Sequence, residues 1–181
     1  MSDSLLPLLE KEFRKQKRLV GSSWRVDETY ILVKGVWKYL YRAVDKAGKT
    51  IDFLLTTKRD KKAAMRFLEK AMQANGIPEK VSMDKSGANK SAIDQIIEDK
   101  GLSIEVRQIK YLNNIVEQDH RAVKRKTGPM LGFKFFSAAA SVRAGIELVH
   151  MIRKGQMAMP EFEGLSFADQ FYALAGQVRP V

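Results

Sequence analysis

Three acidic residues occur at positions that suggest metal-dependent chemistry. Asp27 lies inside the strand-forming run 24–33, where a buried carboxylate costs free energy. Asp84 follows the short strand-like run 81–83, and Glu117 lies in a polar segment further along the chain. Carboxylate oxygens are preferred ligands of hard divalent cations. We therefore expect the fold to bring Asp27, Asp84 and Glu117 together around metal ions.

The composition narrows the kinds of site that this chain can build. The sequence contains no cysteine, which excludes disulfides, thiolate zinc sites and cysteine nucleophiles. His120 and His150 are its only histidines, so a histidine-rich metal site is excluded as well. Any metal must be held by oxygen ligands, which favours Mg²⁺ or Mn²⁺.

The charge and length point to one domain with a polyanionic partner. The 181 residues suffice for one domain with a sizeable core, and the formal net charge is +11. Such a charge favours nucleic acid as the partner, although a merely basic protein is the alternative. No apolar run reaches the roughly 20 residues of a membrane span, and the N-terminus lacks the order of a signal peptide. We expect a cytoplasmic protein that contacts no membrane.

The hydrophobic periodicity predicts an α/β fold. Short glycine-bearing links at 34–35 and 46–49 predict that the first three strands form an antiparallel meander. The strands are expected at 23–33, 36–45, 50–57, 81–84 and 103–109, and the helices at 60–75, 89–100 and 137–154. This order fits a mixed five-stranded sheet with helices on its faces. The last helix is expected to pack through Ala138, Val142, Ile146, Leu148 and Val149.

The sequence around Glu117 predicts a helix with one polar face. At 100° per residue, Glu117 shares this face with Asn113, Asn114, His120, Arg121 and Lys124, whereas apolar residues and Asp119 fall on the opposite arc. A solvated helix face is the alternative interpretation. One acid among amides and cations also suits a metal ligand flanked by phosphate contacts.

Several ordered blocks resemble a known protein family. The blocks are WRVDETY at 24–30, WKYLYRAVD at 37–45, RQIKYLNN at 107–114, HR at 120–121, LGFK at 131–134, GIE at 145–147 and IRKGQ at 152–156. Together they resemble the catalytic core of a DDE transposase from bacterial insertion sequences, of the family usually numbered six. The resemblance spans residues 21–156, which is most of the chain.

The resemblance implies an RNase H-like fold of the retroviral-integrase type, two divalent metal ions (Mg²⁺ or Mn²⁺) and DNA strand transfer. It assigns the family's three acids, in order, to Asp27, Asp84 and Glu117. Candidate DNA contacts are Lys110, Asn113, Asn114, Arg121 and Lys124. The partners implied are DNA and a second copy of the chain, with no small-molecule substrate, in the bacterial cytoplasm beside the nucleoid.

The chain also departs from the family pattern. The interval between Asp84 and Glu117 is slightly shorter than is usual in the family. Family members carry an N-terminal helix-turn-helix, but only 26 residues precede Asp27 here, so we expect this module to be absent. The expected parts are a basic arm or short helix at 1–20, the catalytic core at 21–156 and a tail with a short helix at 157–181. The alternatives are a truncated, non-transposing relic that binds DNA or pairs with full-length transposase, and a plain RNase H-like nuclease.

Overall fold

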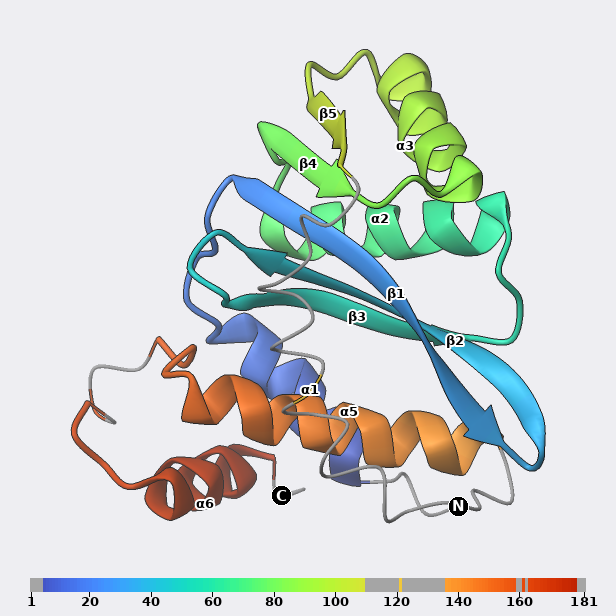
Figure 1. The fold of residues 1–181 in the computed structure, drawn as a ribbon. Helices are drawn as coiled ribbons and strands as arrows, with labels where there is room; N and C mark the ends of the chain where they lie inside the picture. Colours follow the sequence, from blue (N-terminus) through green and yellow to red (C-terminus); the bar gives the residue numbers. More distant parts are fainter. Residues whose placement is uncertain (1–4, 110–120, 122–135, 159–160, 162, 179–181) are drawn as a thin grey trace.

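The computed structural model describes residues 5–109, 121, 136–158, 161 and 163–178 (Figure 1). The strands in this part of the chain are β1 (Ser23–Val33), β2 (Val36–Asp45), β3 (Thr50–Thr56), β4 (Lys80–Met83) and β5 (Glu105–Gln108). The helices are α1 (Leu5–Lys15), α2 (Lys61–Asn75), α3 (Gly87–Lys100), α5 (Phe136–Arg153) and α6 (Phe167–Gln177). Among the described helices, none is both long enough and apolar enough to cross a lipid bilayer.

The five strands form one mixed sheet, as the sequence predicts. Their spatial order is β3-β2-β1-β4-β5. Strands β1, β2 and β3 pair antiparallel, which confirms the meander. Strands β4 and β5 run parallel to β1. Parallel neighbours need a crossover, and helices α2 and α3 provide the two crossovers in chain order.

The β1–β2 turn explains why these strands form a hairpin. Lys34 and Gly35 are the two central residues, with φ of 50° and 73° respectively. Two successive positive φ values define the type I′ turn, whose twist matches that of the flanking strands. Glycine accepts this conformation readily, whereas lysine adopts it at some cost in free energy.

Helices cover both faces of the sheet (Figure 1). Helices α2 and α3 pack on one face around a core that includes Trp24, Val26, Phe67 and Ile93. Helices α1, α5 and α6 pack together on the other face, around a second cluster that includes Phe13. The central part of the sheet is therefore buried between two helical layers, and a residue's place in a strand decides which layer its side chain faces.

Capping residues set the helix ends that the sequence predicts only approximately. Asp60 caps α2 by accepting a hydrogen bond from the backbone N–H of Ala63 at 2.8 Å, as expected. Helix α3 begins two residues before its predicted start, because Ser86 acts as its N-cap. It ends at Gly101 in the left-handed conformation, with φ of 59°.

Helix α5 buries a different set of residues from the one expected. Leu148 is buried as predicted, but Ala138 is exposed. The buried residues of α5 are Ala139, Arg143, Glu147, Leu148, Met151 and Ile152. The prediction was wrong here because it assumed that apolar side chains face the sheet, whereas Arg143 and Glu147 occupy that position with charged partners.

Candidate active site

Asp27 and Asp84 lie at matching positions on neighbouring parallel strands. The pairing of β1 with β4 ends at Val26 opposite Met83, and the next residue on each chain is one of the two acids. In-register residues of a parallel pair point to the same side of the sheet. Asp27 is half-buried, whereas Asp84 is exposed just beyond the end of β4. The strands that carry these two acids up to this point are therefore neighbours in the sheet, as expected.

The loop after β4 holds Asp84 in place. The Asp84 carboxylate accepts a hydrogen bond from the backbone N–H of Lys85 at 2.7 Å, and its carbonyl accepts one from Ser86 at 2.7 Å. Both contacts shape the short connection that leads into α3. Sites at the carboxyl ends of parallel strands, beside such loops, are a recurrent place for ligands in α/β folds.

The other predicted site residues fall mostly outside the described part of the chain. Glu117 lies there, as do the predicted DNA contacts Lys110, Asn113, Asn114 and Lys124. Arg121 is described, and it is exposed. Within the described ranges, no three acidic or histidine side chains are grouped closely enough to hold a metal ion.

Glu28, the neighbour of Asp27, serves a different layer of the fold. Its side chain is only 10% exposed and forms an ion pair with Arg59. Because successive strand residues point to opposite faces, Glu28 faces the α2 layer and Asp27 faces the α5 layer. Glu28 is therefore separated from Asp27 by the sheet itself.

A buried ionic cluster lies behind Asp27, and sequence reasoning missed it. Arg42 on β2 stands directly opposite Asp27 in the antiparallel ladder, so the two side chains share one face. The Arg42 guanidinium is fully buried and donates to Glu147 Oε2 at 2.9 Å and to Thr50 Oγ1 at 3.3 Å. The cluster therefore connects β2, beside the candidate site, to helix α5.

Arg143 completes this cluster one helical turn before Glu147. Its Nη2 lies 3.8 Å from Glu147 Oε1. Burial lowers the pKa of Arg143 to about 10, with Glu147 raising it and Arg42 lowering it further, so the side chain is still cationic at neutral pH. The sequence signal was an arginine and a glutamate four residues apart within an apolar helix, a spacing that puts both on one face.

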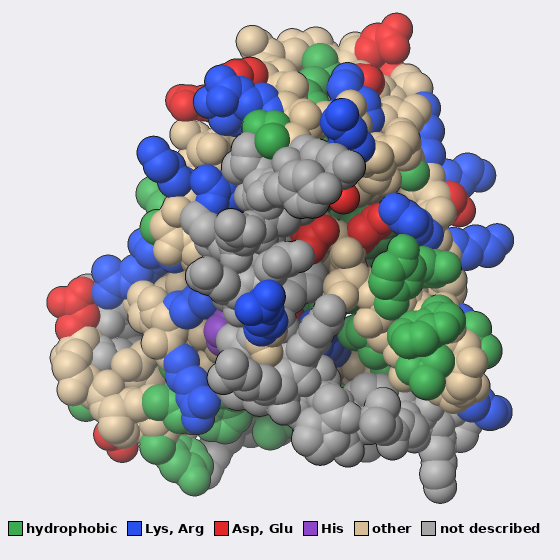
Figure 2. All heavy atoms as spheres, in the orientation of Figure 1, with side chains coloured by type: hydrophobic (Ala, Val, Ile, Leu, Met, Phe, Trp, Pro, Cys, Tyr) green, Lys and Arg blue, Asp and Glu red, His purple; other side chains and the backbone are tan. Residues whose placement is uncertain are grey.

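The surface around this region is charged. Acidic side chains gather near the centre of the face shown in Figure 2, with Lys and Arg side chains spread around them.

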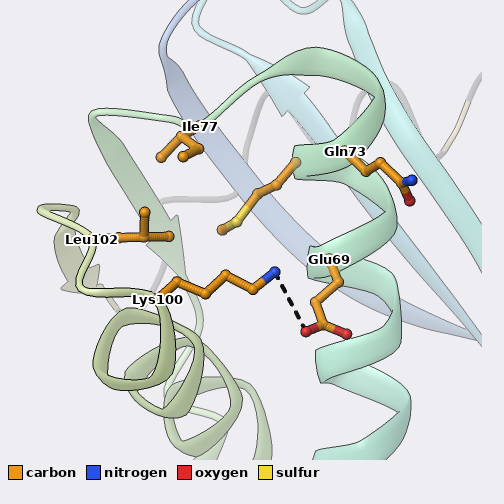
Figure 3. A pocket seen from close by; sticks show the side chains of 6 residues that line it. Glu69, Gln73, Ile77, Lys100 and Leu102 are labelled. Carbon is orange, nitrogen blue, oxygen red and sulfur yellow. Dashed lines mark ion pairs between the residues drawn. The ribbon is translucent and has the colours of Figure 1, made fainter.

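A separate pocket of about 480 Å³ lies between α2 and α3 (Figure 3). Glu69 and Lys100 form an ion pair of 3.6 Å there. Because the pocket is on the α2–α3 side, it contains neither Asp27 nor Asp84.

Comparisons with known proteins agree with these features. Residues 21–156 match a protein family described as a DDE domain. The chain is 35% identical over 162 residues to the Staphylococcus aureus transposase for insertion sequence-like element IS431mec, covering 88% of this chain and 70% of that protein. The transposase of element IS257 in transposon Tn4003 from Staphylococcus aureus matches with the same identity and coverage.

Solved structures show the same fold at low sequence identity. The catalytic core of BIV integrase aligns with a TM-score of 0.56 and 13% identity, covering 87% of this chain and 97% of that one. The HTLV-2 integrase catalytic core in complex with magnesium aligns with a TM-score of 0.51 and 16% identity, covering 64% and 75% of the two chains. The fold is therefore the retroviral-integrase-like RNase H fold that the resemblance implied.

The five-stranded mixed sheet, the acids on β1 and just beyond β4, and a family match over three quarters of the sequence lead to one assignment. The chain is the catalytic domain of a polynucleotidyl transferase and belongs to the DDE transposases of bacterial insertion sequences.

Proposed function

We propose that this domain cleaves and joins DNA strands with two divalent metal ions held by Asp27, Asp84 and Glu117. The observation that supports the proposal is the parallel pairing of β1 with β4, which ends at Val26 opposite Met83, one residue before each aspartate. The DDE family to which the chain belongs is named for two aspartates and a glutamate.

The residues fit a hard divalent cation. Asp84 is exposed and its carboxylate makes a single short hydrogen bond to the adjacent backbone, so it can still coordinate. The HTLV-2 integrase catalytic core, which has a similar fold, was solved in complex with magnesium. Magnesium prefers oxygen ligands such as carboxylates. When bound, such ions activate the attacking oxygen and stabilise the leaving oxygen of a phosphodiester.

The chain's own side chains position the DNA. Lys110, Arg121 and Lys124 are the proposed phosphate contacts, and Asn113 and Asn114 are proposed to orient the site. Arg42 lies across the ladder from Asp27 and keeps a positive charge behind that carboxylate. We also propose that two copies of the chain act together on DNA.

Strand transfer on oligonucleotides tests the assignment. With Mn²⁺, the unaltered protein should join a labelled 3′-hydroxyl end to a target duplex. Asp27→Asn, Asp84→Asn and Glu117→Gln should each lower the rate about a hundredfold or more, because each removes a carboxylate that holds the ions. Asp94→Asn is the matched control, since Asp94 is an exposed acid of α3 paired with Lys90.

Metal binding in the absence of DNA separates the site from the reaction. Calorimetry should show Mn²⁺ binding to the unaltered protein and a raised melting temperature, because a ligand of the folded state stabilises it. The double variant Asp27→Asn, Asp84→Asn should lose both effects. If this double variant binds Mn²⁺ as well as the Asp94→Asn control does, the metal assignment is wrong.

A further inference from the structure

The outer half of the β1–β2 hairpin extends beyond the rest of the described sheet. Strand β4 pairs with β1 only as far as Val26, and β3 pairs with β2 only from Tyr39 onward. Residues 27–38 therefore form a two-stranded ribbon in this part of the structure. A ribbon of two strands is marginally stable by itself, so large side chains across its strands are expected to pack with one another.

One face of this ribbon carries an exposed aromatic group, which we call the hairpin platform: Tyr30, Leu32, Trp37 and Tyr39. Tyr30 stands opposite Tyr39, and Leu32 stands opposite Trp37, so all four side chains share one face. Trp37 is 57% exposed and Tyr30 is 49% exposed. Packing within the hairpin thus leaves about half of each of these two side chains open to solvent.

The rings of the hairpin platform are held in fixed relative positions. Tyr30 packs edge-on against Trp37, with centroids 6.4 Å apart, and against Tyr39, with centroids 5.4 Å apart. The Tyr30 hydroxyl accepts a hydrogen bond of 3.1 Å from Arg59, which also pairs with Glu28. Rings that are already ordered lose little conformational entropy when a ligand stacks on them.

The surroundings of the hairpin platform are basic. Lys34 is exposed at the turn, and Arg59 lies over Tyr30. Lys58 is exposed beside Tyr39, since the Thr56 hydroxyl donates to the carbonyls of both residues. Two copies meeting through this face would bring like charges together, which opposes self-association. Aromatic rings among Lys and Arg instead match a nucleic acid strand, whose bases stack while its phosphates pair with the cations.

We propose that the hairpin platform binds unpaired bases of DNA by stacking on Trp37 and Tyr30. The proposal rests on the proposed action of this domain on DNA and adds a contact surface to it. Tyr30 lies three residues beyond Asp27 on β1, about 10 Å along the strand. The two side chains point to opposite faces of the hairpin, so the hairpin platform would hold unpaired strands on the face away from Asp27 during cleavage and joining.

The tryptophan content makes this contact directly observable. The chain has two tryptophans, of which Trp24 is 1% exposed and Trp37 is 57% exposed. A 15-nucleotide dT strand, added without metal, should therefore quench the fluorescence of Trp37 and leave that of Trp24 unchanged. A duplex of the same length should quench it much less, because its bases are already stacked on each other.

Affinities measured by the anisotropy of labelled oligonucleotides test the energetic role. Trp37→Ala should weaken binding of the dT strand about tenfold or more and binding of the duplex by less than about threefold. Trp37→Phe keeps a stacking ring and should retain most of the affinity. Tyr172→Ala is the matched control, because Tyr172 is an aromatic residue of α6 that is 73% exposed.

Thermal unfolding of each variant checks that the hairpin still folds, and Trp37→Phe reports on stacking if Trp37→Ala does not fold. Unchanged dT affinity in a folded Trp37→Ala variant overturns the proposal. The proposal is also overturned if sedimentation shows that the unaltered protein self-associates, that Trp37→Ala does not, and that the two bind DNA equally well. The hairpin platform would then bind a second copy of the chain. Failure of the unaltered protein to bind any DNA overturns the proposed function as well, whereas strand transfer with unchanged dT affinity overturns the hairpin platform alone.

Discussion

Glu147 is a buried acid whose partners are two buried arginines. Its side chain has no exposed surface, and it contacts Arg42 at 2.9 Å and Arg143 at 3.8 Å. Charges removed from water are tolerated only when they are compensated by opposite charges and hydrogen bonds. The glutamate therefore links α5 to β2. It also holds the Arg42 side chain in position on β2, directly across the ladder from Asp27.

Replacing this acid should destabilise the whole domain. Glu147→Gln removes the carboxylate charge that lies against two buried guanidinium groups, and we expect a loss of about 3–5 kcal/mol in the free energy of unfolding. Urea denaturation measures this loss. Glu163→Gln is the control, because its ion pair with Arg18 is exposed and should contribute less than about 1 kcal/mol. Equal effects of the two substitutions would contradict the structural role of Glu147.

Among the elements, helix α1 is tied to the rest of the fold through Asp52 on β3. Asp52 accepts hydrogen bonds from Arg14 of α1 at 2.8 Å and from Lys70 of α2 at 2.9 Å. Burial alone would raise the pKa of this carboxyl, but Arg14 and Lys70 together hold it below its ordinary value. Three elements thus depend on one ionised side chain.

The pH dependence of stability should reveal this connection. Because the folded-state pKa of Asp52 is depressed, its contribution is complete above the ordinary value of about 4 and is lost as the pH falls through the folded-state value. Asp52→Asn should cost about 3–5 kcal/mol at neutral pH. The difference between variant and unaltered protein should shrink below about pH 4. Denaturation at a series of pH values measures it, and a difference that stays constant with pH would refute it.

A substitution in the turn between strands β1 and β2 should stabilise the fold. Lys34 has a φ of 50°, which asparagine adopts more readily than lysine. Lys34→Asn should therefore raise the free energy of unfolding by up to about 1 kcal/mol. Gly35→Ala is the opposing control and should lower it, because Gly35 has a φ of 73° and alanine is strained there. Calorimetric melting temperatures compare the two, and a destabilised Lys34→Asn would contradict the turn geometry.

For the whole molecule, the net charge of +11 governs its encounter with DNA. Lysine and arginine side chains that neutralise phosphates release counterions, and this release is the sequence-independent part of binding. Lysine and arginine side chains are spread over the face shown in Figure 2 and lie around the acidic side chains near its centre, so this face can attract DNA.

DNA affinity should consequently fall steeply as salt is raised. We expect log K to decrease linearly with log salt concentration, and Arg121→Ala to lower the slope by about one contact. Arg18→Ala is the control, because Arg18 already pairs with Glu163 at 2.9 Å. Filter binding or anisotropy at several salt concentrations gives both slopes. Affinity that does not depend on salt would exclude the phosphate backbone as the main contact.

The sequence by itself determined the local elements and the antiparallel meander of the first three strands. The meander was predictable because strand alternation and a two-residue turn at 34–35 are local features of the chain. The pairing of β1 with β4 was predictable because a parallel strand that follows a crossover helix pairs with an earlier strand. These conclusions need only neighbouring residues and general rules of connection.

Tertiary structure alone decided which side chains meet across the layers. Arg42 and Glu147 are 105 residues apart, and no local pattern pairs a strand arginine with a helix glutamate. The packing face of α5 was mispredicted for that reason. The exposure of Trp37 likewise depends on where β3 and β4 stop. Alternation tells which face a side chain takes, but the extent of the neighbouring elements decides whether that face is covered, and this is a property of the assembled fold.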